Sequence, residues 1–404
     1  MRKSVCKFIV GFSLIYSLIP FNCNSEVIAK TTLDNKAKQI FTDHFQKYKD
    51  LEYYSGAALS IYIPKDNIHN FYLGTTTQQA NSEPIADKTL FQIGSITKSF
   101  TAAVILQLEK ENQLSLNDKI ADHLPQYKKW GDVTIKQILN MTSGLPNYSD
   151  TPLLNAAETK NISQAFSKEE LIKFVYPQVD LNPPLKTGFF YTNTGYILSD
   201  LLVEKIAENS FQDELINRTI SKANLANTFY QPQNLSSDVQ NRLAHGYNYN
   251  QYDNPVLVGK DVVNNNLSWA GAAGAVISNS EDIIHWVNAL FVENTILDKP
   301  QKEKLQQIIS LKTGKPIAKL SEEDSHGFGL GVAAAYDKKL SGQYWFYEGS
   351  TLGFRAVYFY KPCNGVIISS IFNSATNNEN NHIGLLMQDI YKLVMQMNPK
   401  LNCH

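Results

Sequence analysis

Apolar and polar residues follow recognisable periods near both ends of the 404-residue chain. Residues 34–49 place Ile40, Phe41 and Phe45 on one face of a helical wheel, a spacing that predicts an amphipathic helix. Short apolar runs bounded by turn residues predict strands. These runs are 57–63, 68–73, 327–335, 343–346, 355–360 and 366–372, and a last amphipathic helix is expected from about 383 to 397.

The residues between the two ends have a different pattern. From about 90 to 290 the chain is mainly helical and loop-rich, with no internal repeat and no low-complexity tract. Strands at both ends with helices between them predict the α+β class. We expect an antiparallel sheet built from both chain ends (34–75 and 325–398) and flanked by helices. A mainly helical region (90–290) is inserted, within one domain over 34–398.

The first residues have the features of a targeting segment. Arg2, Lys3 and Lys7 precede an apolar run over 8–21, which is short and interrupted for a membrane span. This pattern predicts a signal peptide over 1–25 and an exported protein, periplasmic or secreted. A lipid anchor at Cys23 and an uncleaved membrane anchor remain as alternatives.

The four cysteines divide into two pairs. Cys6 and Cys23 fall in the expected targeting segment, so the mature chain keeps Cys363 and Cys403. A strand leads away from Cys363 and a helix leads back, each covering roughly 25 Å, which brings Cys403 near the starting turn. An oxidising compartment would favour a disulfide between them, with two free thiols as the alternative.

Composition and charge narrow the classes of partner. The chain is 43% hydrophobic and 19% charged, with a net charge of −1. No basic tract favours a nucleic-acid partner. The eight histidines show no metal-ligand spacing, so we expect no metal and no cofactor.

The strongest candidate chemistry lies at Ser95 and Lys98. The two residues are three positions apart at the expected start of a helix, and residues with this spacing share a helix face. A serine hydroxyl needs a nearby base to become a nucleophile, and a lysine can serve if its pKa is lowered. The motif is short, so its meaning depends on the segments that follow it.

Four later segments accompany this motif in a fixed order. They are Leu-Asn-Met-Thr-Ser-Gly-Leu-Pro (139–146), Gly-Phe-Phe-Tyr-Thr-Asn-Thr-Gly-Tyr (188–196), Ser-Trp-Ala-Gly-Ala-Ala-Gly (268–274) and Tyr-Glu-Gly-Ser-Thr-Leu-Gly-Phe (347–354). Over roughly residues 35 to 395 the chain resembles the serine β-lactamase and penicillin-binding-protein superfamily. It is most similar to the branch that holds class C β-lactamases, D-alanyl-D-alanine carboxypeptidases, D-aminopeptidases and related esterases.

The resemblance implies a role for each matching residue. Ser95 is the nucleophile that becomes acylated, and Lys98 assists its deprotonation. Tyr191 moves a proton to the leaving group, and Asn193 orients the substrate amide. The backbone N–H groups of Ser95 and Ser350 form the oxyanion hole.

The last segment departs from the family pattern. Tyr347 stands where the family usually has Lys or His, and it supplies no cation at neutral pH. Glu348, followed by Gly349, is expected to face the substrate, because side chains alternate along a strand. A carboxylate there repels a substrate carboxylate, although Arg355 could offset that charge.

Two Lys-Thr-Gly tripeptides also resemble a family motif. They lie at 186–188 and 312–314, outside the context that the family motif requires, so we expect both to lie outside the site. The resemblance of the remaining segments implies a serine hydrolase that acts on amide or ester bonds through a Ser95 acyl-enzyme. A D-alanyl-D-alanine carboxypeptidase-like enzyme and a hydrolase of D-amino-acid peptides or esters are the leading forms.

Two alternatives stay open. One is a β-lactamase, and the other is a weakly catalytic penicillin-binding-like protein that binds or senses. In each case the expected partner is a small-molecule, peptide or ester substrate, with the cell wall as a candidate setting. Because of Glu348, an amine-bearing or neutral substrate group is expected beside the last segment.

Overall fold

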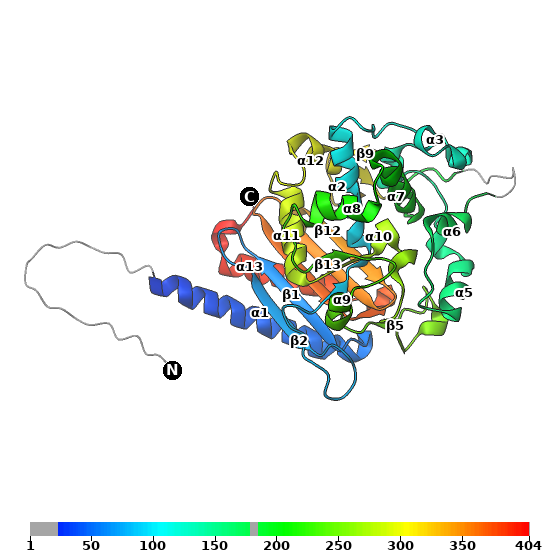
Figure 1. Ribbon diagram of the computed structural model, residues 1–404. Coiled ribbons are helices and arrows are strands. Elements are labelled where there is room, and N and C mark those ends of the chain that lie inside the picture. Colours follow the sequence, from blue (N-terminus) through cyan, green and yellow to red (C-terminus); the bar gives the residue numbers. More distant parts are fainter. Residues whose placement is uncertain (1–22, 178–184, 404) are drawn as a thin grey trace, which may run out of the picture.

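A computed structural model of the chain describes residues 23–177 and 185–403 (Figure 1). The expected targeting segment, 1–25, lies outside the described residues except for its last three. Those three belong to α1 (Cys23–Glu52), which is longer than the helix predicted over 34–49. Among the helices that the structure describes, none combines the length and apolar character needed to cross a membrane.

A nine-stranded antiparallel sheet forms the centre of the molecule. Its order is β2-β1-β14-β13-β12-β11-β10-β8-β9, so the first strand, β1, lies between β2 and β14, the last strand of this sheet. This arrangement confirms the predicted fold class. The strands are β1 (Gly56–Tyr62), β2 (His69–Gly74), β8 (Ile308–Ser310), β9 (Pro316–Ile317), β10 (His326–Phe328), β11 (Ala333–Asp337), β12 (Gly342–Thr351), β13 (Phe354–Lys361) and β14 (Val366–Phe372).

Two strand predictions differ from the structure in their extent. Residues 327–335 form two strands, because the N–H of Gly329 donates to the carbonyl of Val332 at 2.7 Å and closes a turn. The strand predicted over 343–346 continues to Thr351 as β12. The Tyr-Glu-Gly-Ser segment therefore lies on a central strand, paired with β13.

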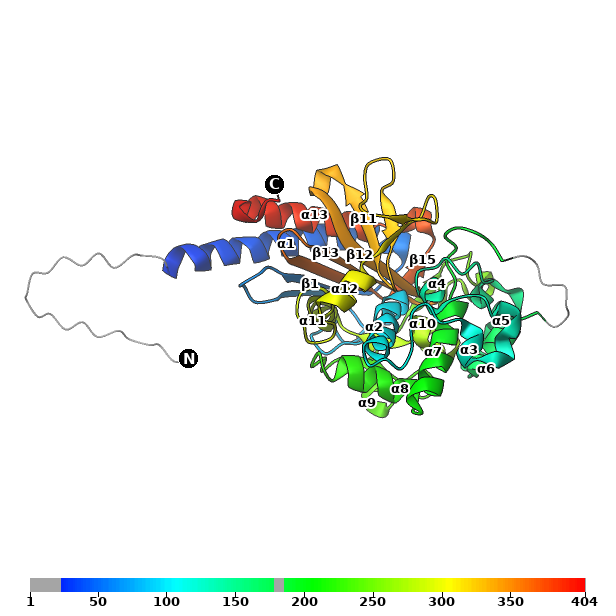
Figure 2. The ribbon, with the colours of Figure 1, turned by 90° about the horizontal axis from the view of Figure 1, so that it is seen from above.

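Helices cover both faces of the sheet. The α1 and α13 (Ile383–Met397) helices lie side by side over one face (Figure 2). Apolar residues from both helices and from β1, β13 and β14 form a separate core there, which includes Phe41, Leu59, Phe359, Ile368 and Ile390. The opposite face packs against α11 (Ser280–Phe291) and the inserted helical region.

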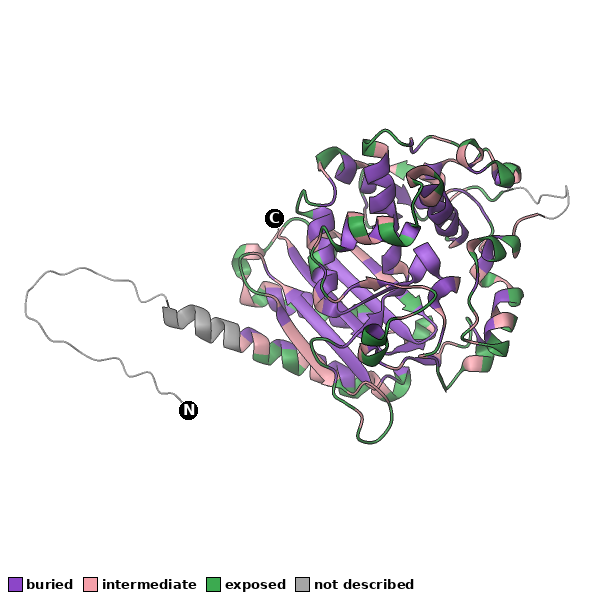
Figure 3. Ribbon diagram, viewed as in Figure 1, coloured by how far each residue is buried: buried purple, intermediate pink, exposed green. Residues whose placement is uncertain are grey.

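The inserted region is organised around α2 (Thr97–Lys110), which is buried over most of its length (Figure 3). The short 3-10 helix Gly94–Ile96 leads directly into it. Around it lie α3 (Ile120–His123), α4 (Ile135–Leu139), α5 (Pro152–Lys160), α6 (Lys168–Lys173), α7 (Thr194–Ala207), α8 (Phe211–Leu215), α9 (Ser237–Arg242), α10 (Gly271–Gly274) and α12 (Lys299–Leu305).

Two small sheets complete the architecture. One has the order β3-β7-β4, and the other β15-β5-β6. Their strands are β3 (Phe91–Gln92), β4 (Phe229–Tyr230), β5 (Tyr247–Tyr249), β6 (Lys260–Asp261), β7 (Val276–Ser278) and β15 (Ser374–Thr376). The first of these sheets ends at β3, immediately before Gly94, and so fixes the entry to the serine motif.

Candidate active site

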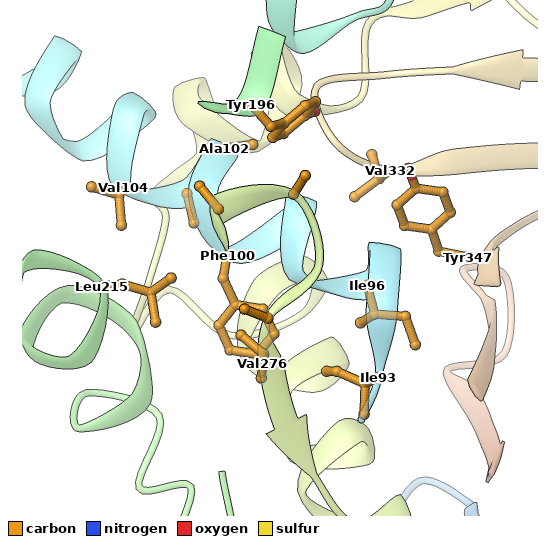
Figure 4. Packing of buried hydrophobic residues seen from close by; sticks show 14 of the residues in the cluster. Ile93, Ile96, Phe100, Ala102, Val104, Tyr196, Leu215, Val276, Val332 and Tyr347 are labelled. Atoms are coloured by element: carbon orange, nitrogen blue, oxygen red, sulfur yellow. The ribbon is translucent and has the colours of Figure 1, made fainter. Parts of the chain in front are cut away.

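Ser95 lies where the sheet meets the helical region. It is the middle residue of the 3-10 helix before α2, and its side chain is partly exposed. Buried apolar side chains in and next to this segment pack into the hydrophobic core; they include Ile93, Ile96 and Phe100 (Figure 4). The apolar pattern that predicted the helix therefore also anchors the position of Ser95.

Two polar side chains converge at Ser95. The Nζ of Lys98 lies 3.0 Å from the Ser95 Oγ, and it also donates to the carbonyl of Ala273 at 2.8 Å. The hydroxyl of Tyr191 lies 2.6 Å from the same Oγ. The structure thus brings Ser95, Lys98 and Tyr191 together, as their motifs predict, although they come from the 3-10 helix before α2, from α2 and from the segment before α7.

Lys98 has the surroundings of a general base. Its side chain is fully buried, and this burial lowers the pKa of Lys98 from its usual range, while the nearby Tyr191 acts in the opposite direction. A neutral Lys98 amine can accept the proton of the Ser95 hydroxyl.

Tyr347 lies beneath the reacting groups. Its hydroxyl is 3.4 Å from that of Tyr191, and its ring packs edge-on against Phe328. Burial raises the pKa of Tyr347 well above its usual value, and the neighbouring Tyr191 raises it further. Tyr347 is therefore an uncharged hydroxyl at the position where the resemblance leads us to expect a cation, and it contacts Tyr191 without contributing a positive charge.

The backbone of β12 passes very close to the serine motif. A Cβ atom at Gly94, whose φ is +49°, would lie 2.6 Å from the amide nitrogen of Ser350. A Cβ atom at Gly349 would lie 2.8 Å from the amide nitrogen of Ser95. Only glycine allows this approach, which places the two amides expected to form the oxyanion hole next to each other.

Asn193 presents an unused acceptor to the site. Its Nδ2 donates to the Ser149 Oγ at 2.9 Å, and its backbone N–H donates to the Asn147 Oδ1 at 2.9 Å. The Asn193 Oδ1 is buried and accepts no hydrogen bond from the residues described. A substrate amide N–H would satisfy this oxygen, which is the role that the resemblance implies.

Arg355 corrects one sequence-based expectation. It is 1% exposed, and its guanidinium donates to Glu52 at 2.7 Å, Ser374 at 2.9 Å and Asn381 at 2.9 Å. It therefore cannot reach a substrate carboxylate. A buried guanidinium needs paired anions and acceptors, and α1 supplies Glu52 from 303 residues away in the sequence.

Arg355 nevertheless influences Glu348 through Asn381. Asn381 accepts a hydrogen bond from Arg355 and donates one to the Glu348 carboxylate. Burial raises the pKa of Glu348, whereas Arg355 lowers it. The network fixes the orientation of Glu348 on β12, as part of the lining of the pocket that contains Ser95.

The pocket above Ser95 has a volume of about 360 Å³, which is suited to a small ligand. Its described lining contains four carboxylic acids and no Lys, Arg or His. The lining residues are Ser95, Asn147, Ser149, Asp150, Leu154, Asn155, Glu158, Tyr191, Asn193, Asp253, Trp269, Glu348, Ser350, Thr351 and Leu352.

Sequence reasoning missed three of the four acids in this pocket. Asp150 and Glu158 follow the Thr-Ser-Gly-Leu-Pro segment without a motif of their own, and Asp253 lies in an Asn-rich loop. The two Lys-Thr-Gly tripeptides do not contribute to the described lining. They meet each other instead, since a Cβ atom at Gly314 would lie 2.3 Å from the Cα of Gly188.

Comparison with known proteins assigns the chain to a protein family. The Beta-lactamase family model matches residues 41–388, so the chain belongs to this family. Penicillin-binding protein 4* of Bacillus subtilis (strain 168) is 27% identical over 270 residues, 65% of this chain and 55% of that protein. Protein flp of Staphylococcus aureus (strain COL) is 25% identical over 300 residues, 71% and 53% respectively. The chain spans about half the length of these curated relatives.

A solved structure agrees over nearly the whole fold. D-amino acid amidase from Ochrobactrum anthropi SV3, complexed with D-phenylalanine, has a TM-score of 0.75 at 21% identity and covers 90% of this chain and 99% of its own. At 21% identity this similarity supports the assignment of the fold alone. The family match confirms the superfamily expected from the motifs.

Proposed function

We propose that the protein is a serine hydrolase that cleaves amides or esters of amino acids carrying a free amine, with D-amino-acid derivatives as the leading substrates. The observation that carries this proposal is the contact of Ser95 with Lys98 and Tyr191 in a pocket lined by carboxylic acids. The D-amino acid amidase with a similar fold supports the choice of substrate.

The chemistry follows from the three contacts. Neutral Lys98 accepts the Ser95 proton, and the Ser95 Oγ attacks the substrate carbonyl carbon. The N–H groups of Ser95 and Ser350 stabilise the oxyanion. The Tyr191 hydroxyl passes a proton to the leaving amine or alcohol as the carbonyl–heteroatom bond breaks, and the proton held by Lys98 replaces it on Tyr191. A water molecule then releases the acid from the acyl-enzyme and restores the Ser95 hydroxyl.

Charge in the pocket favours an amine over a carboxylate. Two unit charges of the same sign at about 5 Å repel by about 3 kcal/mol at an effective dielectric constant of about 20. An ionised Glu348 would impose a penalty of this order on a carboxylate placed beside β12. This argues against a β-lactamase or a D-alanyl-D-alanine carboxypeptidase, whose substrates carry that carboxylate.

A substrate panel tests the proposal. D-Phenylalanine amide, its L-enantiomer, N-acetyl-D-phenylalanine amide, a D-alanyl-D-alanine peptide and a penicillin are compared by kcat/KM. We expect the free D-amine to be hydrolysed fastest. Glu348→Gln should slow its hydrolysis and relieve the penalty on the carboxylate-bearing substrates, while Glu303→Gln, at an exposed position on α12, should change nothing. Efficient wild-type hydrolysis of the penicillin or the D-alanyl-D-alanine peptide contradicts the proposal.

We also propose that the protein is exported after removal of residues 1–25 and carries a Cys363–Cys403 disulfide. The Cα atoms of the two cysteines are 5.8 Å apart, within the range that a disulfide spans. Intact mass before and after reduction and alkylation, on protein from the culture or periplasm, tests both points. Protein retained in the cytoplasm, or two thiols alkylated without reduction, contradicts them.

A further inference from the structure

The far wall of the pocket contains a carboxyl group that the proposed chemistry does not use. Glu158 lies on α5 and is 3% exposed, and it lines the same pocket as Ser95. Its Oε1 is buried and accepts no hydrogen bond within the described part of the chain. A buried carboxylate oxygen without a donor is costly, so a donor from a bound molecule would stabilise it.

Two further carboxyl groups lie on the same wall. Asp150 comes from the 3-10 helix Tyr148–Asp150, and Asp253 comes from the loop after β5. Each already accepts one side-chain hydrogen bond, from Asn147 at 2.7 Å and from Asn250 at 2.8 Å. The wall therefore offers three carboxyl groups, of which Glu158 is the deepest and the least satisfied.

The elements that form this wall differ from the strand that carries Glu348, although all four acids line one pocket. Both ribbon views place α5 at the outer edge of the helical region, away from β12 (Figures 1 and 2). A substrate amine beside Glu348 would leave the carboxyl groups of the far wall unpaired. The indole of Trp269 also lines the pocket, and an aromatic face attracts an organic cation.

The ligand that fits this wall is an organic cation. Across the described residues, no group of three or more His, Cys, Asp or Glu side chains is arranged to hold a metal ion. An ammonium group supplies three donors and one positive charge, which matches an unpaired carboxylate oxygen flanked by two more acids.

We propose that Glu158, Asp150 and Asp253 form a subsite for a second, remote ammonium group of the substrate. The inference rests on the proposed function, and it narrows the substrate class to amides, esters or peptides whose acyl residue is a diamino acid. Lysine- and ornithine-like residues belong to this class. One amine then lies beside Glu348, and the side-chain ammonium lies against Glu158.

The titration of Glu158 agrees with this role. Burial raises the pKa of Glu158 to about 7, and nearby Asp253 also raises it. The amides of Asn265 and Asn254 act in the opposite direction but leave Oε1 without a hydrogen bond. A bound ammonium would favour the anion, as these amides do.

The test compares two substrates whose side chains both contain four carbons. D-Lysine amide and D-norleucine amide differ chiefly in the terminal ammonium group, and kcat/KM is measured for both. We expect the wild type to prefer the lysine amide. Glu158→Gln should reduce that preference on the order of tenfold while leaving the norleucine amide nearly unchanged. Glu303→Gln, an exposed carboxyl on α12, should retain the wild-type preference.

Each other outcome has a distinct meaning. A wild type that hydrolyses both amides equally, or a Glu158→Gln variant that slows both equally, overturns the subsite and leaves the proposed function standing. Hydrolysis of neither amide refutes the proposed function itself. If Glu158→Gln does not fold, Asp253→Asn at the exposed rim replaces it, and an unchanged preference in that variant contradicts the inference.

Discussion

The two tyrosines at the site make a prediction that separates proton transfer from positioning. The Tyr191 hydroxyl is 2.6 Å from the Ser95 Oγ, whereas the Tyr347 hydroxyl touches only Tyr191 in this group, at 3.4 Å. Tyr191→Phe removes a group that exchanges protons with the reacting atoms, and loss of such a group typically costs 10²- to 10⁴-fold in rate. Tyr347→Phe removes one long hydrogen bond, to Tyr191.

The expected loss of kcat/KM for Tyr347→Phe follows from that hydrogen-bond geometry. A net contribution of about 0.5 to 1.5 kcal/mol corresponds to a loss of at most about tenfold in kcat/KM. The Phe ring would keep its contact with Phe328, so the free energy of unfolding should change by less than about 1 kcal/mol.

The assay is steady-state hydrolysis of D-phenylalanine amide, with urea unfolding of each variant. Tyr62→Phe, on β1 and outside the described pocket lining, is the matched control and should have wild-type kinetics. A loss for Tyr347→Phe as large as that for Tyr191→Phe would refute the reasoning, because Tyr347 would then carry protons itself.

Three further predictions concern charge and close packing. Activity should rise with pH through the pKa of Lys98, with a midpoint below the usual lysine pKa of about 10.4, because burial favours the neutral amine; a midpoint at or above that pKa contradicts this. Glu52→Gln should lower the free energy of unfolding by about 3 to 5 kcal/mol in urea titrations, since it leaves buried Arg355 without its anion; a loss below about 1 kcal/mol would show that the pair is dispensable. Gly349→Ala should reduce kcat by at least about 10²-fold, because the new Cβ atom displaces the Ser95 amide; wild-type kcat would exclude this amide from the oxyanion hole.

The sequence was sufficient to predict the residues with local signals. Ser95 and Lys98 are one helical turn apart, and Tyr191 belongs to a recognisable segment, so each could be assigned before their contacts were known. The sheet could be predicted for the same reason, because alternating apolar runs at both chain ends indicate strands. The turn that divides residues 327–335 had no comparable signal, since it depends on one backbone hydrogen bond.

The partners of Arg355 and the acidic wall could not be predicted in the same way. Glu52 lies 303 residues before Arg355, at the end of a helix whose other acidic and basic residues from Asp34 to Asp50 are exposed or partly exposed, apart from His44. Asp253 lines the same pocket as Glu158, but it lies in an Asn-rich loop whose sequence is typical of a surface loop. Such contacts depend on how distant segments pack, and no period or motif in the chain records that packing.

Mass spectrometry of the acyl-enzyme tests the central claim most directly. Wild-type protein mixed with an excess of D-phenylalanine methyl ester is quenched in acid and digested. We predict a phenylalanyl adduct on the peptide that contains Ser95, absent in Ser95→Ala and accumulating more slowly in Lys98→Met. Turnover of the ester without any adduct in the wild type, or an adduct that persists in Ser95→Ala, would contradict the account.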